Sequence, residues 1–193
     1  AATSQAGEQR KEYPHTWAAA LNLARLRHLD HDDQNALAIL EHAHADYPQI
    51  WEIVRFETKL LRENKGPNAA LHLIAQFTQE NWWHHDANVS LGRLLWEENK
   101  VATAMETFRF ASWLDIHEVE ALNLLVGMQL QQNRFEEALA TQERAVSRQP
   151  DEPRQYLLLS DVLQRMNRTN EAERAHARFE QLQALAQVSV AKN

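Results

Sequence analysis

The sequence predicts an all-α protein built from five helical hairpins in tandem, an α-solenoid. Three observations predict this fold: a regular sequence period, apolar residues at helical spacing within each period, and a low content of helix-breaking residues. Four glycines and five prolines occur among 193 residues, and both residue types disfavour helix interiors. A chain of this length also has enough material for a sizeable core. The composition therefore permits helices throughout the chain.

The period appears first in two short stretches, EYPHTW at residues 12–17 and DYPQIW at residues 46–51, which share an acid, Tyr-Pro and Trp at matching places. Alanine recurs at the same interval in all five repeats, and asparagine recurs at a second position of the last three. The alanines are Ala36, Ala70, Ala104, Ala138 and Ala172, and the asparagines are Asn99, Asn133 and Asn167. The spacing is 34 residues in each case. A fixed period of this length indicates a repeat array, in which each unit buries its apolar face by stacking on its neighbours.

Each repeat is expected to contain two amphipathic helices joined by a short polar turn. In the third repeat, apolar residues recur at helical spacing in residues 87–100 and again in residues 101–114. Asparagine suits the turn because it tolerates the left-handed conformation that ends a helix. In the second repeat Gly66 takes this position, and Pro67 opens the next helix. The recurring alanine is small, so the two helices of a hairpin can approach closely.

The period divides the chain into repeats at about residues 17–50, 51–84, 85–118, 119–152 and 153–186. Residues 1–14 are polar, and we expect a flexible segment or the remnant of a preceding repeat there. Residues 187–193 are expected to form a C-terminal tail.

Two charged residues occupy positions where an apolar residue is expected, Arg27 in the first repeat and Glu57 in the second. One interpretation is that the helices are slightly rotated, so that both side chains are exposed. The other is a partly buried Arg27–Glu57 pair between neighbouring hairpins, which would fix register more than it adds stability.

The unit resembles the tetratricopeptide repeat (TPR): it has an early aromatic residue or leucine, a small residue, a fixed alanine and a closing proline. The fourth repeat resembles the family most, through Leu122, Leu125, Ala138, Ala145 and Pro150. The resemblance covers roughly residues 15–186. It implies a right-handed superhelix of hairpins that binds protein partners in a groove lined by the first helix of each hairpin.

Composition and charge exclude several classes of function. The net charge of −7 and the isoelectric point near 5.8 argue against binding to nucleic acid or to an acidic membrane surface. Without cysteine, disulfides and thiolate metal sites are impossible. No apolar run approaches the roughly 18 residues that a membrane helix needs. We expect a soluble protein, cytoplasmic or periplasmic, and the sequence leaves the compartment open.

The ten histidines are the only plausible material for catalysis or metal binding. The sequence contains no glycine-rich phosphate loop, no G-x-S-x-G turn and no HExxH motif. The two histidine clusters, HLDHDD at residues 28–33 and WWHHD at residues 82–86, lie at expected turns or helix ends, where polar residues are common. We therefore predict that the chain is not an enzyme and uses no cofactor and no metal.

Positive charge recurs on the expected first helices despite the negative net charge. Arg25, Lys59 and Arg93 occupy the same place in three successive repeats, and Arg55, Lys59 and Arg62 share one helix face. These cations predict that an acidic or extended peptide segment binds in the groove of repeats 1–3. The predicted partner-binding residues are Asn22, Arg25, His28, Arg55, Lys59, Arg62, Val89, Arg93 and Trp96. The alternative is that the cations are ordinary solvated charges, some of them paired with acids on their own helices.

Two other classes of function stay open. The first is self-association, as a homodimer or structural scaffold, through the Trp82–Trp83 edge or the ends of the stack. Trp82 occupies a position where other repeats have proline; with Trp83 it either fills the gap between the second and third hairpins or forms an exposed aromatic anchor. The second class is an accessory repeat domain of a larger enzyme or assembly protein.

Overall fold

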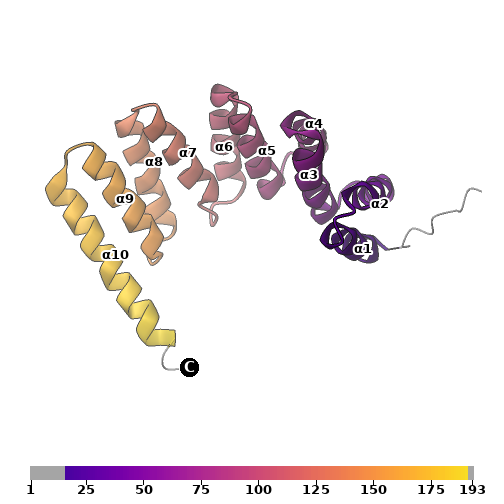
Figure 1. Cartoon of the computed structure of the whole chain (residues 1–193). Helices are drawn as coiled ribbons and strands as arrows, with labels where there is room; N and C mark the ends of the chain where they lie inside the picture. The colour runs from indigo at the N-terminus through magenta and orange to yellow at the C-terminus, as the bar shows by residue number, and fades with distance from the viewer. Residues whose placement is uncertain (1–15, 191–193) are drawn as a thin grey trace, which may run out of the picture. The chain divides into compact units, whose positions relative to one another are not determined.

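The computed structural model describes residues 16–190, which form ten α-helices arranged as five antiparallel hairpins (Figure 1). This part of the chain contains no β-strand, so the predicted all-α class is confirmed. The helices are α1 (Trp17–Leu29), α2 (Asp33–Asp46), α3 (Trp51–Lys65), α4 (Pro67–Glu80), α5 (His85–Glu97), α6 (Val101–Leu114), α7 (Glu120–Gln131), α8 (Phe135–Arg148), α9 (Pro153–Arg165) and α10 (Thr169–Val190).

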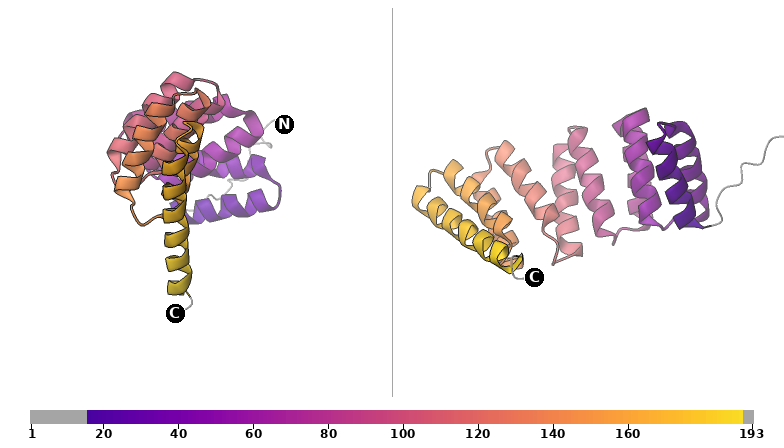
Figure 2. Two further views of the ribbon diagram at one scale, coloured as in Figure 1. Left: turned by 90° about the vertical axis from the view of Figure 1, so that its left-hand side faces the viewer. Right: turned by 60° about the horizontal axis from the view of Figure 1, so that its bottom comes forward.

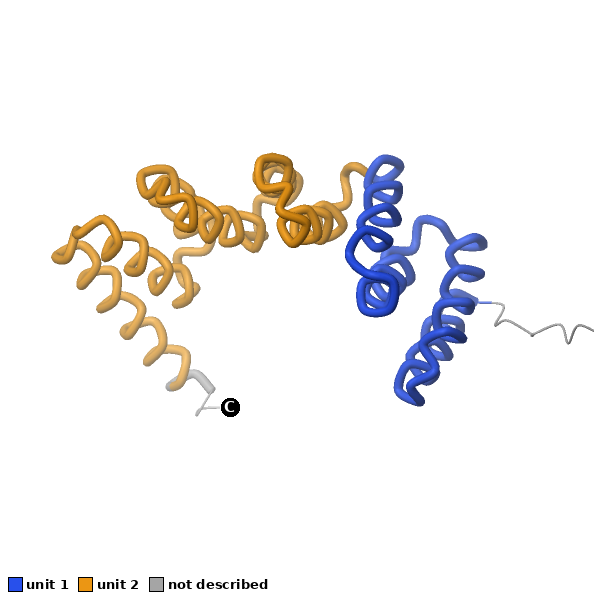
Figure 3. Tube along the Cα trace, turned by 45° about the horizontal axis from the view of Figure 1, so that its top comes forward, with its two compact units in different colours: residues 1–81 blue, residues 82–193 orange. Residues whose placement is uncertain are grey.

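The hairpins fall into two compact units, coloured separately in Figure 3. Unit 1 ends at Asn81 and contains α1–α4, and unit 2 begins at Trp82 and contains α5–α10. The expected N-terminal segment, residues 1–14, lies outside the described residues. Helix α10 continues to Val190 and so includes the first part of the expected C-terminal tail.

The turns inside the last four hairpins have the predicted residues with positive φ. Asn99, Asn133 and Asn167 have φ angles of 57°, 57° and 58°, and Gly66 has a φ of 89°. His31 occupies the corresponding place in the first repeat with a φ of 60°, which was not predicted from the sequence. At each asparagine the next backbone N–H donates to a carbonyl of the preceding helix at 2.8–2.9 Å. These bonds satisfy carbonyls that would otherwise lack partners at the helix end.

The recurring alanines lie where the two helices of a hairpin approach each other. Their relative exposure is 0% in the first four repeats and 1% at Ala172. The third hairpin, α5 with α6, is packed still more closely: a Cβ atom added to Gly92 would lie 2.6 Å from the ring of Phe108, which is fully buried. Small residues at these points therefore set the distance between the helices.

Hydrogen bonds between side chains and backbone connect neighbouring helices of unit 2. The fully buried Gln142 of α8 donates to the backbone carbonyl of Gln155 in α9 at 2.8 Å, and Ser160 of α9 donates to the carbonyl of Ala172 in α10 at 3.0 Å. Figure 2 shows α9 and α10 packed side by side, with the longer α10 extending past its partner. Buried polar groups are thus paired with carbonyls across the stack, which favours one register over its alternatives.

Candidate functional site

The first helices of unit 1 expose most of the predicted cations. Helices α1 and α3 are in contact, and Arg25 on α1 and Arg55, Lys59 and Arg62 on α3 are all exposed. Asn22 of α1 is exposed as well. We call the surface formed by Arg25, Arg55, Lys59 and Arg62 the basic face. It places four positive charges on two neighbouring helices of a chain whose net charge is −7.

His28, another predicted binding residue, connects the basic face to the turn between α1 and α2. Its Nδ1 lies 2.6 Å from Oδ1 of Asp33, and its Nε2 lies 3.4 Å from the Lys59 ammonium. Because an ammonium group can only donate, Nε2 is the acceptor, and Nδ1 carries the proton that it donates to Asp33. The Lys59 ammonium also lies 5.9 Å from the ring centre of Phe56, within cation–π distance. The position of Lys59 is therefore defined by two neighbours.

Asp33 completes this network. Its other oxygen accepts from the side-chain amide of Asn64 on α3 at 3.0 Å. The hydrogen bond from His28, then that from Asn64, lowers the pKa of Asp33 below its ordinary value. One carboxylate thus joins α1, α2 and α3 beside the basic face.

The other predicted binding residues, Val89, Arg93 and Trp96, lie on α5 in unit 2. Arg93 is exposed and donates to the Glu120 carboxylate of α7. Trp96 is half-buried, whereas the side chain of Val89 is almost inaccessible at 3% exposure. The predicted set is therefore divided between the units, with Asn22, Arg25, His28, Arg55, Lys59 and Arg62 in unit 1.

A pocket of about 440 Å³ lies on the first-helix side of unit 2, and it was not predicted from the sequence. Arg93 of α5, Asn123 and Leu124 of α7, and Arg154 and Gln155 of α9 are among its lining residues. The Oδ1 atom of Asn123 is buried and has no hydrogen-bond partner among the described residues. A buried acceptor without a donor is unfavourable.

The pair that the structure forms at Glu57 differs from the predicted one. Glu57 is 4% exposed and accepts from Nδ1 of His44 on α2 at 3.0 Å, whereas Arg27 is exposed. Both expectations for these residues were therefore partly wrong: Glu57 is buried in an inter-hairpin pair, but its partner is His44. The hydrogen bond to Glu57 raises the pKa of His44, against the opposing effect of burial, and the charge of Glu80 adds to the increase.

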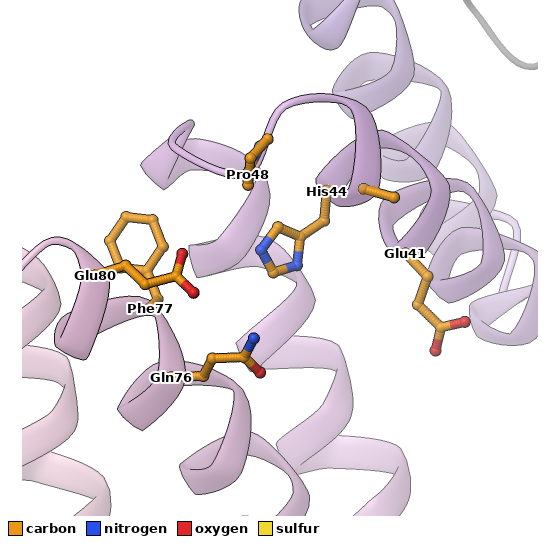
Figure 4. Close-up of a pocket in the computed structure, with 7 residues that line it drawn as sticks. Glu41, His44, Pro48, Gln76, Phe77 and Glu80 are labelled. Atoms are coloured by element: carbon orange, nitrogen blue, oxygen red, sulfur yellow. The ribbon is translucent and has the colours of Figure 1, made fainter.

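His44 also lines a pocket of about 330 Å³ between α2 and α4 (Figure 4). Figure 4 shows its imidazole on the side of the Glu80 carboxylate, whereas the carboxylate of Glu41 points away from it, and the buried Phe77 is part of the wall. The pocket lies on the second helices of unit 1, where no binding residue was predicted. In the sequence, only Glu57, a charged residue at an expected core position, indicated that this region differs from an ordinary apolar core.

Unit 2 exposes an unusual number of aromatic side chains. Trp82 and Trp83 are each 57% exposed, Phe110 is 43% exposed and Trp113 is 78% exposed. The ring of Trp82 lies 5.9 Å from that of Trp83 and 6.5 Å from that of Phe110. Only the first two residues were singled out from the sequence. The spacing of Phe110 and Trp113, three residues apart on an expected second helix, was the signal that could have identified the others.

The histidine clusters have local roles. His84 accepts from the backbone N–H of Ala87 at 3.4 Å and caps α5, while His85 lies 3.0 Å from Asp86. Among residues 16–190, no group of three or more histidine and carboxylate side chains has a geometry that could hold a metal ion. None of the helices in this range is both long and apolar enough to cross a membrane.

Comparison with known proteins identifies one repeat directly. Residues 119–152, the fourth repeat, match the model of the tetratricopeptide repeat family. A stretch of 91 residues, 47% of this chain, is 35% identical to the human protein O-mannosyl-transferase TMTC1. The match spans 10% of the length of that protein, so the similarity concerns a small part of it.

Solved structures show the fold of the whole array. MamA from Desulfovibrio magneticus RS-1 aligns with a TM-score of 0.69 over 89% of this chain and 97% of its own, at 14% identity. PilF from Pseudomonas aeruginosa aligns with a TM-score of 0.68 over 86% and 75%, at 16% identity. YrrB, described as a TPR protein with an unusual peptide-binding site, aligns with a TM-score of 0.62 over 92% and 93%, at 13% identity. The fourth repeat therefore matches the tetratricopeptide repeat family, and the ten described helices form an α-solenoid of five hairpins with the fold of these structures.

Proposed function

We propose that this chain is a non-catalytic protein-interaction scaffold whose basic face binds an acidic, extended segment of a partner protein. The observation that carries the proposal is the exposure of four cations on α1 and α3, with Lys59 positioned by His28 and Phe56. A relative in fold, YrrB, is described as having a peptide-binding site, which supports binding of this kind. The fold alone does not assign it, because folds of one family bind different partners.

The strength of binding follows from the exposure of the cations. Exposed ion pairs contribute roughly 0.2–1 kcal/mol each, whereas micromolar affinity requires about 8 kcal/mol. Four ion pairs therefore supply at most about half of that free energy. The remainder has to come from apolar contacts, for which the partly exposed ring of Phe56 is available beside Lys59.

The pocket of unit 2 is a second candidate for binding an extended segment. It is supported by Arg93 and Arg154, two cations in the same lining. Of the predicted binding residues on α5, Arg93 would then act in this pocket, separately from the basic face.

Two further proposals concern the chain as a part of assemblies. Self-association through Trp82 and Trp83 depends on unit 2 and not on the basic face. An accessory role in a larger enzyme or assembly protein is supported by the similarity to a short stretch of a much longer transferase. In either case we propose that this chain contributes binding and no catalysis of its own.

Binding to an arrayed library of acidic and neutral peptides tests the basic face. The variant is the triple substitution Arg55→Glu, Lys59→Glu and Arg62→Glu. The control carries the same change in charge at exposed residues of unit 2, through Lys100→Glu, Arg144→Glu and Arg174→Glu. We expect acidic peptides to bind the wild type and the control, and to lose at least tenfold in affinity for the triple variant.

Circular dichroism establishes whether both variants keep their helical content. Acidic peptides that bind the triple variant as well as the wild type would exclude the basic face. If affinity instead falls on Asn123→Ala or Arg154→Ala, the site is the pocket of unit 2.

A further inference from the structure

Unit 2 exposes four aromatic side chains, Trp82, Trp83, Phe110 and Trp113, which we together call the aromatic patch. Trp82 contacts the rings of both Trp83 and Phe110. Phe110 and Trp113 are three residues apart on α6, so they are neighbours on one side of that helix. The residues of the patch therefore come from the segment before α5 and from the last turns of α6.

The patch is held in place from within unit 2. The buried Asn88 of α5 donates its side-chain amide to the backbone carbonyls of Trp82 and His84, both at 2.9 Å. These two bonds fix the segment that carries Trp82 against α5. A surface whose backbone is already fixed loses less conformational entropy when it is covered.

The exposed area of the patch is close to what the centre of a dimer interface needs. A fully buried aromatic side chain covers about 150–250 Å², so the exposed fractions correspond to roughly 350–600 Å². A standard interface buries about 800 Å² per partner, with an apolar centre and a polar rim. A single exposed apolar patch of this size already reaches the upper range found on monomeric proteins.

The charges beside the patch favour a second copy of the same chain as its partner. Glu106 lies one turn before Phe110, and Arg109 lies one turn before Trp113, so the two side chains bring opposite charges to the rim. Arg109 also lies 3.9 Å from Glu137 of α8, a long ion pair that leaves its guanidinium exposed. In a two-fold interface the same surface is used by both copies, and each charge can meet its opposite on the other copy. We propose that the aromatic patch is the centre of a two-fold homodimer interface.

This inference develops the proposed self-association and does not depend on acidic segments binding to the basic face. The net charge of −7 makes two copies repel each other. Association through the patch is therefore weakest at low salt and strengthens when the repulsion is screened.

Sedimentation equilibrium of the full chain at several concentrations tests the interface. The variant is Trp113→Glu, and the matched control is Leu29→Glu, which places the same charge on a comparably exposed apolar residue of unit 1; the two side chains are 78% and 73% exposed. We expect a concentration-dependent dimer for the wild type and for the control. Because buried tryptophans dominate interface energies, the dissociation constant should rise at least tenfold in Trp113→Glu.

A wild-type chain that stays monomeric at every concentration would overturn the proposal and leave the patch to a different protein. Equal loss of the dimer in Leu29→Glu and Trp113→Glu would also overturn it. Trp82→Ala provides a second variant, expected to weaken the dimer while α6 is unchanged. Since Trp113 is remote from the basic face in sequence and lies in the other unit, Trp113→Glu should bind acidic peptides as the wild type does, which separates the two proposals.

Discussion

Glu57 and His44 form a contact in unit 1 whose strength depends on pH. Glu57 is 4% exposed, and its carboxylate accepts from the imidazole of His44, which belongs to the neighbouring hairpin. A buried carboxylate without its partner would carry a large desolvation cost. The pair therefore ties α3 to α2, and its contribution depends on the protonation of His44.

Glu57→Gln is expected to destabilise the protein more at pH 6 than at pH 8.5. The pKa of His44 is raised in the folded protein. The contribution of the charged pair is fully present below the ordinary histidine pKa of about 6.5, and it is lost as the pH rises through the raised value. A hydrogen bond to a charged group contributes about 1.5–3 kcal/mol, so we expect a loss of this size at pH 6, measured by urea unfolding.

Glu63→Gln on the same helix is the control, because Glu63 is exposed. It should change the free energy of unfolding little at either pH. An equal loss for Glu57→Gln at both pH values would contradict the charged pair, as would a pKa of His44, measured by NMR, that does not fall in that variant.

Turn residues were more predictable from the sequence than partners of buried charges. Asn99, Asn133 and Asn167 were predicted to be left-handed because few other residues tolerate that backbone, and the structure confirms it. His31 adopts the same conformation in the first repeat, where the sequence has no asparagine or glycine at this position. The partner of Glu57 could not be predicted, because an expected Arg27 and the actual His44 lie on different helices whose rotation the sequence does not define.

At the scale of helices, replacing two glycines with different surroundings by alanine is expected to change stability in opposite directions. A Cβ atom at Gly92 would lie 2.6 Å from the ring of Phe108, whereas one at Gly127 in α7 would meet no atom within 4 Å. Gly92→Ala should therefore force α5 and α6 apart and cost about 1–3 kcal/mol. Gly127→Ala should stabilise the protein by about 0.5–1 kcal/mol, because alanine favours the helix and loses less entropy on folding.

Thermal unfolding followed by circular dichroism measures both effects, with a lower melting temperature for Gly92→Ala and a higher one for Gly127→Ala. A stable Gly92→Ala variant would show that the Phe108 ring can move aside. The two helices carrying these glycines were predictable from apolar spacing, but the difference between the glycines was not. It depends on which residue of the facing helix lies opposite, and that is a property of packing.

At the scale of the whole molecule, the two proposed binding surfaces belong to different units. The basic face belongs to unit 1, and the aromatic patch belongs to unit 2. The periodic cations predicted the first surface, because a regular repeat returns each side chain to the same place on successive hairpins. Phe110 and Trp113 break the period, and so the sequence identified only the Trp82–Trp83 part of the second surface.

The two proposed interactions should respond to salt in opposite directions. The Debye length falls from about 10 Å at 0.1 M to about 3 Å at 1 M ionic strength. Screening weakens the attraction between the basic face and an acidic peptide, and it also weakens the repulsion between two copies that each carry a net charge of −7. As salt rises, the dissociation constant of the peptide should therefore increase, measured by fluorescence anisotropy, while that of the dimer decreases, measured by sedimentation. If both constants moved in the same direction, one surface would have been assigned the wrong partner, and Trp113→Glu and the Arg55, Lys59 and Arg62 triple variant would identify which.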